Sequence, residues 1–269
     1  MFTSADATGT GRPGNRFKQA LGKYQQLGLF SALSSPHVAE LLALCRFDWL
    51  VVDTEHSPND LNDVIGQLKS IALHAVAPVV RAAWNDPVLV KQLLDTGAQS
   101  VLFPYVETPE QAARAVSFTR YPPAGMRGVA ASSRAAGFGT DDGYLKSADQ
   151  EICVIVQIET ARGLDNLEAI AMTDGIDAVF IGPADLAASL GHIGEPQHPS
   201  VQRAIDEALR TLAALGKPRG YLTGDLLEAR RRLMEGVDFM ALGTDALLLA
   251  RAARRALAEI RSSAPVVAT

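Results

Sequence analysis

Residues 153–191 read CVIVQIETARGLDNLEAIAMTDGIDAVFIGPADLAASLG and contain the repeating unit of the fold. The apolar, β-branched runs at 153–160 and 177–182 are typical of strands, and residues 162–173 between them show the apolar spacing of a helix. A strand, a helix and a second strand in this order predict parallel strands with a helix between them.

The same alternation extends in both directions along the chain. Strands are predicted at 28–33, 49–55, 77–83, 100–106, 153–160, 177–182, 218–223 and 239–244. Helices are predicted at 37–46, 61–74, 87–97, 109–120, 162–173, 199–216, 226–236 and 246–260, with a further helix at 15–25. Eight strand–helix units in about 250 residues favour a (β/α)8 TIM barrel over a doubly wound sheet, which usually has fewer strands.

The 269 residues are accounted for by one barrel domain at 15–262. Residues 1–14 are expected to form a flexible N-terminal tail, and residues 263–269 a C-terminal tail. The spacing of elements breaks at 121–152, a stretch rich in Gly, Ala and Ser that is too long for an ordinary connection. We expect a long loop over one end of the barrel there.

The composition argues against nucleic-acid and membrane partners. The 25 basic and 30 acidic residues give a net charge of −5, without the positive field that a phosphate backbone requires. The apolar runs are far shorter than the ~20 residues of a membrane span, and the N-terminus lacks the pattern of a signal peptide. Cys45 and Cys153 are too few for a disulfide framework and suit a reducing interior, so we expect a cytoplasmic protein.

Polar residues fall at the predicted carboxyl ends of the strands, where a TIM barrel carries its active site. The strand starts, in contrast, are mostly apolar. The polar residues converge on one face and are Asp53, Glu55, His56, Arg81, Gln157, Glu159, Asp185, Thr223 and Thr244.

Glu159 and Asp185 are separated by 26 residues, about one strand–helix unit. This spacing predicts two carboxylates on adjacent strands, and two such oxygen ligands suit a hard divalent cation. The alternative is that one of the two carboxylates pairs with Arg81 or Arg162 and that no metal binds.

His56 follows Asp53 by three residues, so a carboxylate could orient its imidazole for acid–base work. The alternative is a loop histidine bonded to the backbone. Arg81 could stabilise a developing oxyanion or simply pair with Glu55. The other histidines are interpreted as surface or capping residues: His37, His74, His192 and His198.

The turn at Gly182–Pro183 ends a strand and begins a helix, so the N–H groups of Ala184 and Asp185 could bind a carboxylate or a phosphate. None of the six lysines ends a predicted strand. A Schiff-base mechanism, which needs a lysine in the barrel mouth, is therefore not expected.

Five ordered segments resemble the metal-dependent pyruvate aldolases of the HpcH/HpaI family, which act on 2-keto-3-deoxy sugar acids or 4-hydroxy-2-oxo diacids. The likeness runs from about Phe17 to Ile260. The segments are FDWLVVDTEHSPND (47–60), PVVRAAWNDPVLVKQLLDTGAQ (78–99), RYPPAGMRGV (120–129), VQIETARGLDNL (156–167) and VFIGPADLAASLG (179–191).

This resemblance implies a TIM barrel of the phosphoenolpyruvate/pyruvate type that uses Mg, Mn, Co or Zn and no organic cofactor. It implies Glu159 and Asp185 as metal ligands, His56 as the acid–base residue and Arg81 as the group that stabilises the oxyanion. Asp95 matches an aspartate that supports the histidine. Its predicted place at a helix end, away from its own site, means that it could act only across a subunit interface of a homo-oligomer, a hexamer built as a trimer of dimers.

The remaining expectations concern the substrate. By the resemblance, Gln157, Gly182, Ala184 and Asp185 hold the pyruvate part of a 2-oxo acid, and the C3–C4 bond breaks to give an aldehyde through a metal-stabilised pyruvate enolate. Phe30 stands where many relatives have Trp, and Leu222 and residues 130–139 are expected on the aldehyde side. The stretch SSRAAGFGTDDGYL (132–145) resembles the branch that cleaves 2-dehydro-3-deoxyglucarate.

Three other functions stay open at this point. A CoA-ester lyase of the citrate-lyase-β or malyl-CoA type would need a basic patch for the CoA phosphates, for which Arg127 and Arg134 are the loop candidates. An oxaloacetate decarboxylase would show little dependence on an aldehyde. A barrel without catalysis would bind no divalent ion.

Overall fold

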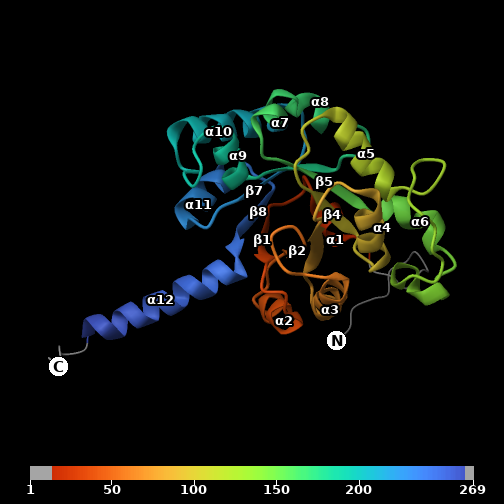
Figure 1. Ribbon diagram of the computed structural model, residues 1–269, viewed down its shortest axis with the longest axis horizontal. Coiled ribbons are helices and arrows are strands. Elements are labelled where there is room, and N and C mark those ends of the chain that lie inside the picture. The colour runs from red at the N-terminus through yellow and green to blue at the C-terminus, as the bar shows by residue number, and fades with distance from the viewer. Residues whose placement is uncertain (1–13, 264–269) are drawn as a thin grey trace.

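The computed structural model describes residues 14–263, and its strands close into a parallel barrel with each strand paired to the next in sequence (Figure 1). The last strand pairs with the first and completes the ring. The predicted TIM barrel is confirmed. The strands are β1 (Gln26–Ser31), β2 (Trp49–Asp53), β3 (Ala77–Arg81), β4 (Ser100–Phe103), β5 (Cys153–Ile158), β6 (Ala178–Ile181), β7 (Arg219–Leu222) and β8 (Phe239–Thr244).

Several strands end earlier than predicted because polar groups at their carboxyl ends hold the following loops. In β2, for example, Asp53 accepts hydrogen bonds from the backbone N–H groups of Glu55 at 3.0 Å and His56 at 3.4 Å. These bonds turn the chain away from the barrel wall. The side chains expected at the mouth therefore lie on or just after the last strand residue.

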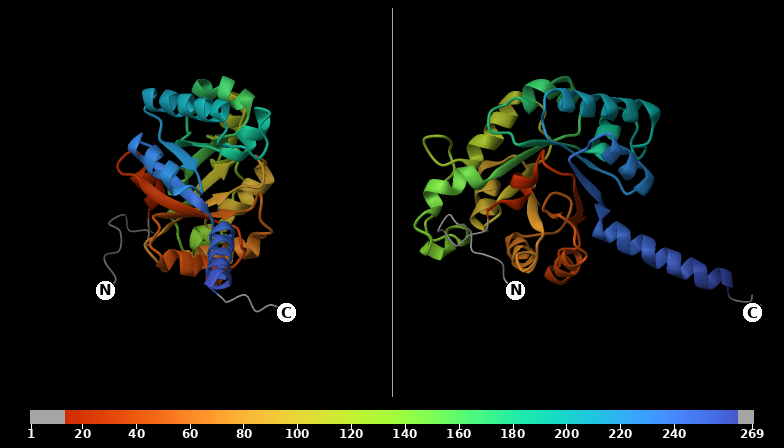
Figure 2. Two further views of the ribbon diagram at one scale, coloured as in Figure 1. Left: turned by 90° about the vertical axis from the view of Figure 1, so that its left-hand side faces the viewer. Right: turned by 180° about the vertical axis from the view of Figure 1, so that it is seen from behind.

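Helices alternate with the strands, and the helices between β1 and β8 lie around the barrel (Figures 1 and 2). Ser35, Asp60, Asp86 and Thr108 each cap a helix start with a side-chain oxygen, as expected at an N-cap. The helices are α1 (Arg16–Ala20), α2 (Pro36–Leu44), α3 (Leu61–Ile71), α4 (Pro87–Asp95), α5 (Pro109–Thr119), α6 (Tyr144–Glu151), α7 (Ala161–Asp165), α8 (Leu167–Ala171), α9 (Pro183–Ser189), α10 (Pro199–Ala214), α11 (Leu226–Met234) and α12 (Asp245–Ser263).

Aromatic rings fill the amino-terminal half of the barrel interior. Phe17, from α1, packs against Trp49 at 5.4 Å and against Phe239 at 5.3 Å between ring centroids. Gly220 makes room for this packing, because a Cβ there would lie 2.2 Å from the Phe239 ring. The strand-start end is thus closed by side chains, and the opposite end is left for the site.

The predicted loop at 121–152 is partly helical, containing a 3-10 helix at Arg134–Gly139 and α6. Arg134 donates a hydrogen bond to the carbonyl of Thr96, just beyond the end of α4. The segment joins a helix to the next strand, so it lies at the strand-start end of the barrel. The expectation that residues 130–139 contact the aldehyde is therefore wrong within one chain, since the site lies at the other end.

Helix α12 does not pack on the barrel, although its apolar spacing predicted it correctly as a helix. It projects from the body of the molecule in Figure 1 and in the right-hand view of Figure 2, and each residue from 247 to 262 is exposed. The outer helix that should follow β8 is thus missing from the barrel surface. Leu27 in β1 is accordingly 37% exposed, whereas β2 to β6 carry no exposed residue.

Within residues 14–263, no helix combines the length and the apolar character needed to cross a bilayer. The predicted tails at 1–14 and 263–269 lie, apart from Gly14 and Ser263, outside the described residues.

Candidate active site

Arg81, the last residue of β3, is the cationic centre of the barrel mouth. Its Nε and Nη2 donate to the two carboxylate oxygens of Asp53 at 2.8 and 2.7 Å. Its Nη1 lies 2.8 Å from Glu55 Oε2. Phe30 of β1 lies beneath the guanidinium, 4.9 Å from ring centroid to Cζ. The pairing of Arg81 with Glu55 is thus present, and Nη1 and Nη2 each keep a second N–H.

Asp53 does not orient the imidazole of His56, contrary to the sequence interpretation. Both of its oxygens are engaged by Arg81 and by loop N–H groups. Burial acts to raise the pKa of Asp53, but the bonds from Arg81 outweigh it and the pKa is lowered. The carboxylate nearest the imidazole is Glu55, whose Oε2 lies 3.8 Å from His56 Nε2.

Glu55 and His56 differ sharply in their environments. The Glu55 side chain is buried, and burial, together with the nearby Asp53 and Asp185 carboxylates, raises its pKa to about 7 despite Arg81. The His56 side chain is 58% exposed at the mouth. The imidazole is therefore accessible from the mouth, while Glu55 is a buried partner beside it.

Glu159 follows β5 directly and is almost fully buried. Its Oε1 accepts from the backbone N–H of Tyr105 at 2.8 Å, and its Oε2 accepts from the side-chain amide of Gln157. Gly182 provides the space for this carboxylate, because a Cβ there would lie 2.7 Å from Glu159 Oε2. Burial raises the pKa of Glu159 to about 7, with Glu55 and Asp185 adding to the shift.

Asp185 lies in the first turn of α9, and its Oδ1 accepts from the phenol of Tyr105 at 2.8 Å. Among residues 14–263, no basic side-chain nitrogen lies within 4 Å of the Glu159 or Asp185 carboxylates, so neither forms an ion pair. The alternative of pairing with Arg81 or Arg162 is thus excluded for the described chain; Arg162 instead lies 3.7 Å from Glu107.

This donor set fits a hard divalent cation. Two carboxylates with neutral hydrogen-bond donors and no neutralising side chain present uncompensated negative charge, which a cation stabilises. In addition, Gln157 Oε1 is buried without a hydrogen-bond partner. An orphaned oxygen of this kind is usually satisfied by water or by a bound group.

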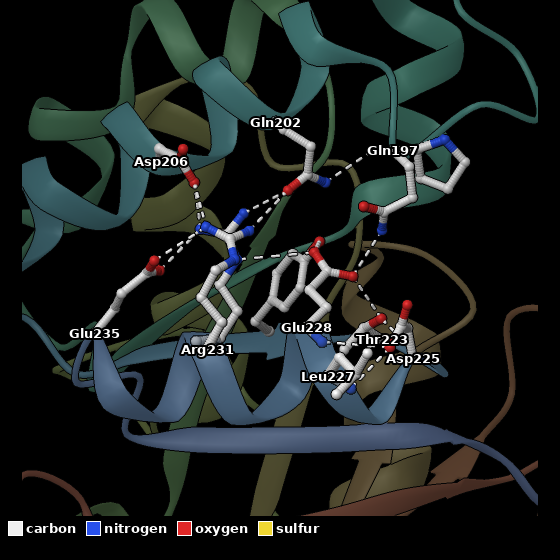
Figure 3. Close-up of polar contacts among 12 residues, drawn as sticks. Gln197, Gln202, Asp206, Thr223, Asp225, Leu227, Glu228, Arg231 and Glu235 are labelled. Atoms are coloured by element: carbon white, nitrogen blue, oxygen red, sulfur yellow. Dashed lines mark hydrogen bonds and ion pairs between the residues drawn. The ribbon is translucent and has the colours of Figure 1, made fainter.

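The mouth also includes residues that the sequence interpretation missed. Tyr105 contacts both predicted metal ligands. The sequence prediction placed it inside the strand at 100–106, so nothing marked it as a site residue. Glu228 of α11 is a second case: it accepts from Tyr221 at 2.8 Å, from Thr223 at 2.7 Å and from Gln197 at 2.7 Å (Figure 3). These bonds fix the end of β7, where the predicted substrate contact Leu222 lies.

Asp95 lies at the end of α4, on the strand-start side, as predicted. Its Oδ1 is 3.1 Å from Arg127 Nη2. Arg127 is only 2% exposed and is held between the rings of Tyr121 and Tyr144. A guanidinium this deeply buried cannot bind the phosphates of CoA, which removes one of the two basic residues that a CoA-ester lyase would need.

A second group of possible metal ligands comprises His192, Glu195 and His198, whose ligand atoms lie within 4.8 Å of one another. The two histidines therefore have partners, unlike in the sequence interpretation, although His198 does cap α10 as expected. Their rings stack at 3.6 Å with 16° between planes. Imidazole lone pairs lie in the ring plane, so those of two stacked rings lie in separate, nearly parallel planes and do not both point at one ion. This group therefore matches a metal site poorly.

Fold and site together define a TIM-barrel enzyme with an acidic, cation-compatible mouth beside a buried arginine. The chain belongs to the HpcH/HpaI aldolase/citrate lyase family, whose model matches residues 26–252. The predicted family is thereby confirmed, and the chain is a lyase of the aldolase type.

Relatives cover nearly the whole chain. A hydroxypyruvate/pyruvate aldolase of Cupriavidus necator is 51% identical over 249 residues, which is 92% of this chain and 93% of that protein. A 5-keto-4-deoxy-D-glucarate aldolase of Shigella dysenteriae is 49% identical over 246 residues, with coverages of 91% and 96%. A crystal structure of a family protein from Burkholderia cenocepacia superposes with a TM-score of 0.89 at 45% identity, covering 92% of this chain and 99% of that one.

Proposed function

We propose that this aldolase reversibly cleaves the C3–C4 bond of 4-hydroxy-2-oxo acids to give pyruvate and an aldehyde. The observation that carries the proposal is the pair of carboxylates, Glu159 and Asp185, which receive only neutral donors and lie in the same mouth as Arg81. The names of the relatives, a pyruvate aldolase and a sugar-acid aldolase, support the same reaction class.

Glu159 and Asp185 would hold the divalent ion, and their hard oxygens favour Mg²⁺ or Mn²⁺ among the family's metals. When bound, such a cation polarises the 2-oxo group and stabilises the negative charge that develops there. The pyruvate part would contact Gln157, Gly182, Ala184 and Asp185. Gln157 Oε1, which has no hydrogen-bond partner, can accept a hydrogen bond from a water molecule in this region.

The chain's own side chains account for charge and proton movement. In the cleavage direction the C4 hydroxyl loses a proton, the C3–C4 electron pair moves toward C2, and C3 later gains a proton. His56, exposed at the mouth beside Glu55, would take the hydroxyl proton in cleavage and give it back in the reverse, condensation direction. Arg81, held in place by Asp53, would stabilise the developing oxyanion with its remaining N–H groups.

The aldehyde partner is proposed to be a sugar-acid aldehyde, with Leu222 and Phe30 on its side of the site. Leu222 is only partly buried at the end of β7, where Glu228 fixes the neighbouring Thr223. Phe30 supports Arg81 from below. A fixed end of β7 at Leu222 would limit the size of the aldehyde.

We further propose a homo-oligomer, a hexamer built as a trimer of dimers, in the cytoplasm, where a reducing interior suits the two free cysteines. In each dimer, α12 of one copy would cover the surface beside β1 of the other copy, which that copy's own α12 leaves uncovered. Both halves of this contact are present in one chain: an unpartnered amphipathic helix, and the exposed Leu27, Leu41 and Leu44 of β1 and α2. Asp95 would act only in such an assembly, at the site of another copy.

The test is pyruvate release from a panel of 4-hydroxy-2-oxo acids by chelator-treated protein, with and without added Mg²⁺ or Mn²⁺. We expect metal-restored cleavage that is lost in Glu159→Gln and Arg81→Ala. Glu168→Gln and Arg162→Ala alter exposed residues of the same types and should keep activity. Cleavage that survives metal removal and both site substitutions would refute the proposal, as would cleavage of oxaloacetate or CoA esters alone.

A further inference from the structure

Tyr105 touches both proposed metal ligands through two different groups. Its backbone N–H donates to Glu159 Oε1, and its phenolic O–H donates to Asp185 Oδ1, each at 2.8 Å. The two carboxylates come from different elements, one after β5 and one in α9, and Tyr105 itself follows β4. One residue therefore fixes the relative position of two side chains that the rest of the fold supplies separately.

The backbone of Tyr105 is held in an unusual conformation. Its φ is +52°, in the left-handed region that residues other than glycine, asparagine and aspartate rarely adopt. The next residue, Val106, donates its N–H to the carbonyl of Gln157 at 3.3 Å, and the Tyr105 ring packs 5.6 Å from the ring of Trp84. Such a conformation persists where surrounding contacts fix it, and these contacts direct both donors of Tyr105 toward the acidic pair.

The chemistry of the two donors differs from that at the other carboxylates of the mouth. Asp53 and Glu55 both form ion pairs with the guanidinium of Arg81. Tyr105 instead offers a neutral N–H and a neutral O–H, which orient the carboxylates without cancelling their charge. Neutral donors of this kind add no positive charge beside the carboxylates that would compete with a cation, as expected of groups that orient metal ligands.

We propose that Tyr105 is a positioning residue that orients Glu159 and Asp185 together for divalent-metal binding. This inference rests on the proposed metal role of the two carboxylates. A residue serving only to shape the β4–α5 loop would affect the stability of the protein and leave the affinity for metal unchanged.

The test is the affinity of Tyr105→Phe for Mn²⁺, measured by the electron paramagnetic resonance signal of free Mn²⁺ in titrations of full-length protein. The variant keeps the ring and the backbone and removes only the phenolic oxygen. We expect its Kd for Mn²⁺ to rise about tenfold, with cleavage activity largely restored at saturating Mn²⁺. Tyr24→Phe, which alters an exposed phenol, should bind like the unaltered protein.

The outcomes distinguish a failure of the proposed role of Tyr105 from a failure of the proposed metal site. An unchanged or lower Kd in Tyr105→Phe, while Glu159→Gln still abolishes binding, overturns the role of Tyr105 and leaves the metal site intact. Binding that is equal in the unaltered protein and in Glu159→Gln overturns the metal site, and the role of Tyr105 with it. Thermal unfolding of each variant shows whether it is folded under the titration conditions.

Discussion

Helix α12 provides the most direct test of how this chain completes its barrel. Leu257 and Ile260 lie on the apolar side of the helix and are 50% and 72% exposed in a single copy. If the helix covers the surface beside β1 of another copy, these side chains become buried in the dimer. We therefore expect the double substitution Leu257→Ala and Ile260→Ala to weaken self-association while leaving the barrel folded.

The size of the effect follows from the area that association would newly bury. Each substitution removes three carbons, about 2.4 kcal/mol on full burial at roughly 0.8 kcal/mol per carbon. Scaling by the exposed fractions gives about 3 kcal/mol per helix, and reciprocal exchange doubles this to about 6 kcal/mol per dimer. The dimer Kd should rise about 10⁴-fold.

Sedimentation equilibrium over nanomolar to micromolar protein concentrations measures this shift. Met172→Ala is the matched control, because Met172 is an exposed apolar residue that follows α8, away from β1 and α12. Circular dichroism should show an unaltered barrel in both variants. An unaltered protein that is monomeric at micromolar concentration, or a double variant that associates as tightly as the control, would contradict burial of α12 in a dimer.

Three further predictions concern the mouth. Arg81→Lys keeps a charge but loses the two-pronged contact to Asp53, so we expect kcat for pyruvate release to fall about 10²–10³-fold; near-normal kcat would contradict an oxyanion role. Gly182→Ala places a Cβ 2.7 Å from Glu159 Oε2. We expect the Kd of this variant for Mn²⁺, measured by calorimetry, to rise at least about tenfold. An unchanged Kd would show that the Glu159 carboxylate is not a ligand. Burial raises the pKa of Glu55 to about 7, so the folded state holds the Glu55 proton more tightly than the unfolded chain does. The free energy of unfolding of the metal-free protein should therefore fall as pH rises from about 5 to 7. Urea unfolding across this range should show a flatter slope for Glu55→Gln, and an identical slope would refute the assignment.

Local chemistry and periodicity were enough to predict the barrel and most of its mouth. The strand predicted at 153–160 is present at 153–158, and the Gly-Pro turn predicted to begin a helix is followed by α9. Because the carboxyl ends of parallel strands meet at one face, the polar residues that close the strands had to converge there. The gathering of Arg81, Glu159 and Asp185 therefore needed no tertiary information.

The hydrogen-bond partners of these groups could not be predicted in the same way, because they depend on distances between strands. Asp53 was expected beside His56, three residues away, yet Arg81 from the adjacent strand engages both of its oxygens. Tyr105 gave almost no signal, since its role depends on a left-handed turn after β4 and on carboxylates 54 and 80 residues further along the chain.

The sequence by itself determined the order of elements, the parallel barrel and the end at which the polar residues gather, because these follow from side-chain periodicity and strand direction. Only the tertiary structure decided which carboxylate faces which donor, that Arg127 is buried between two tyrosine rings, and that α12 lies off the barrel. An amphipathic pattern specifies that one helix face will be buried. It does not specify which surface will bury it.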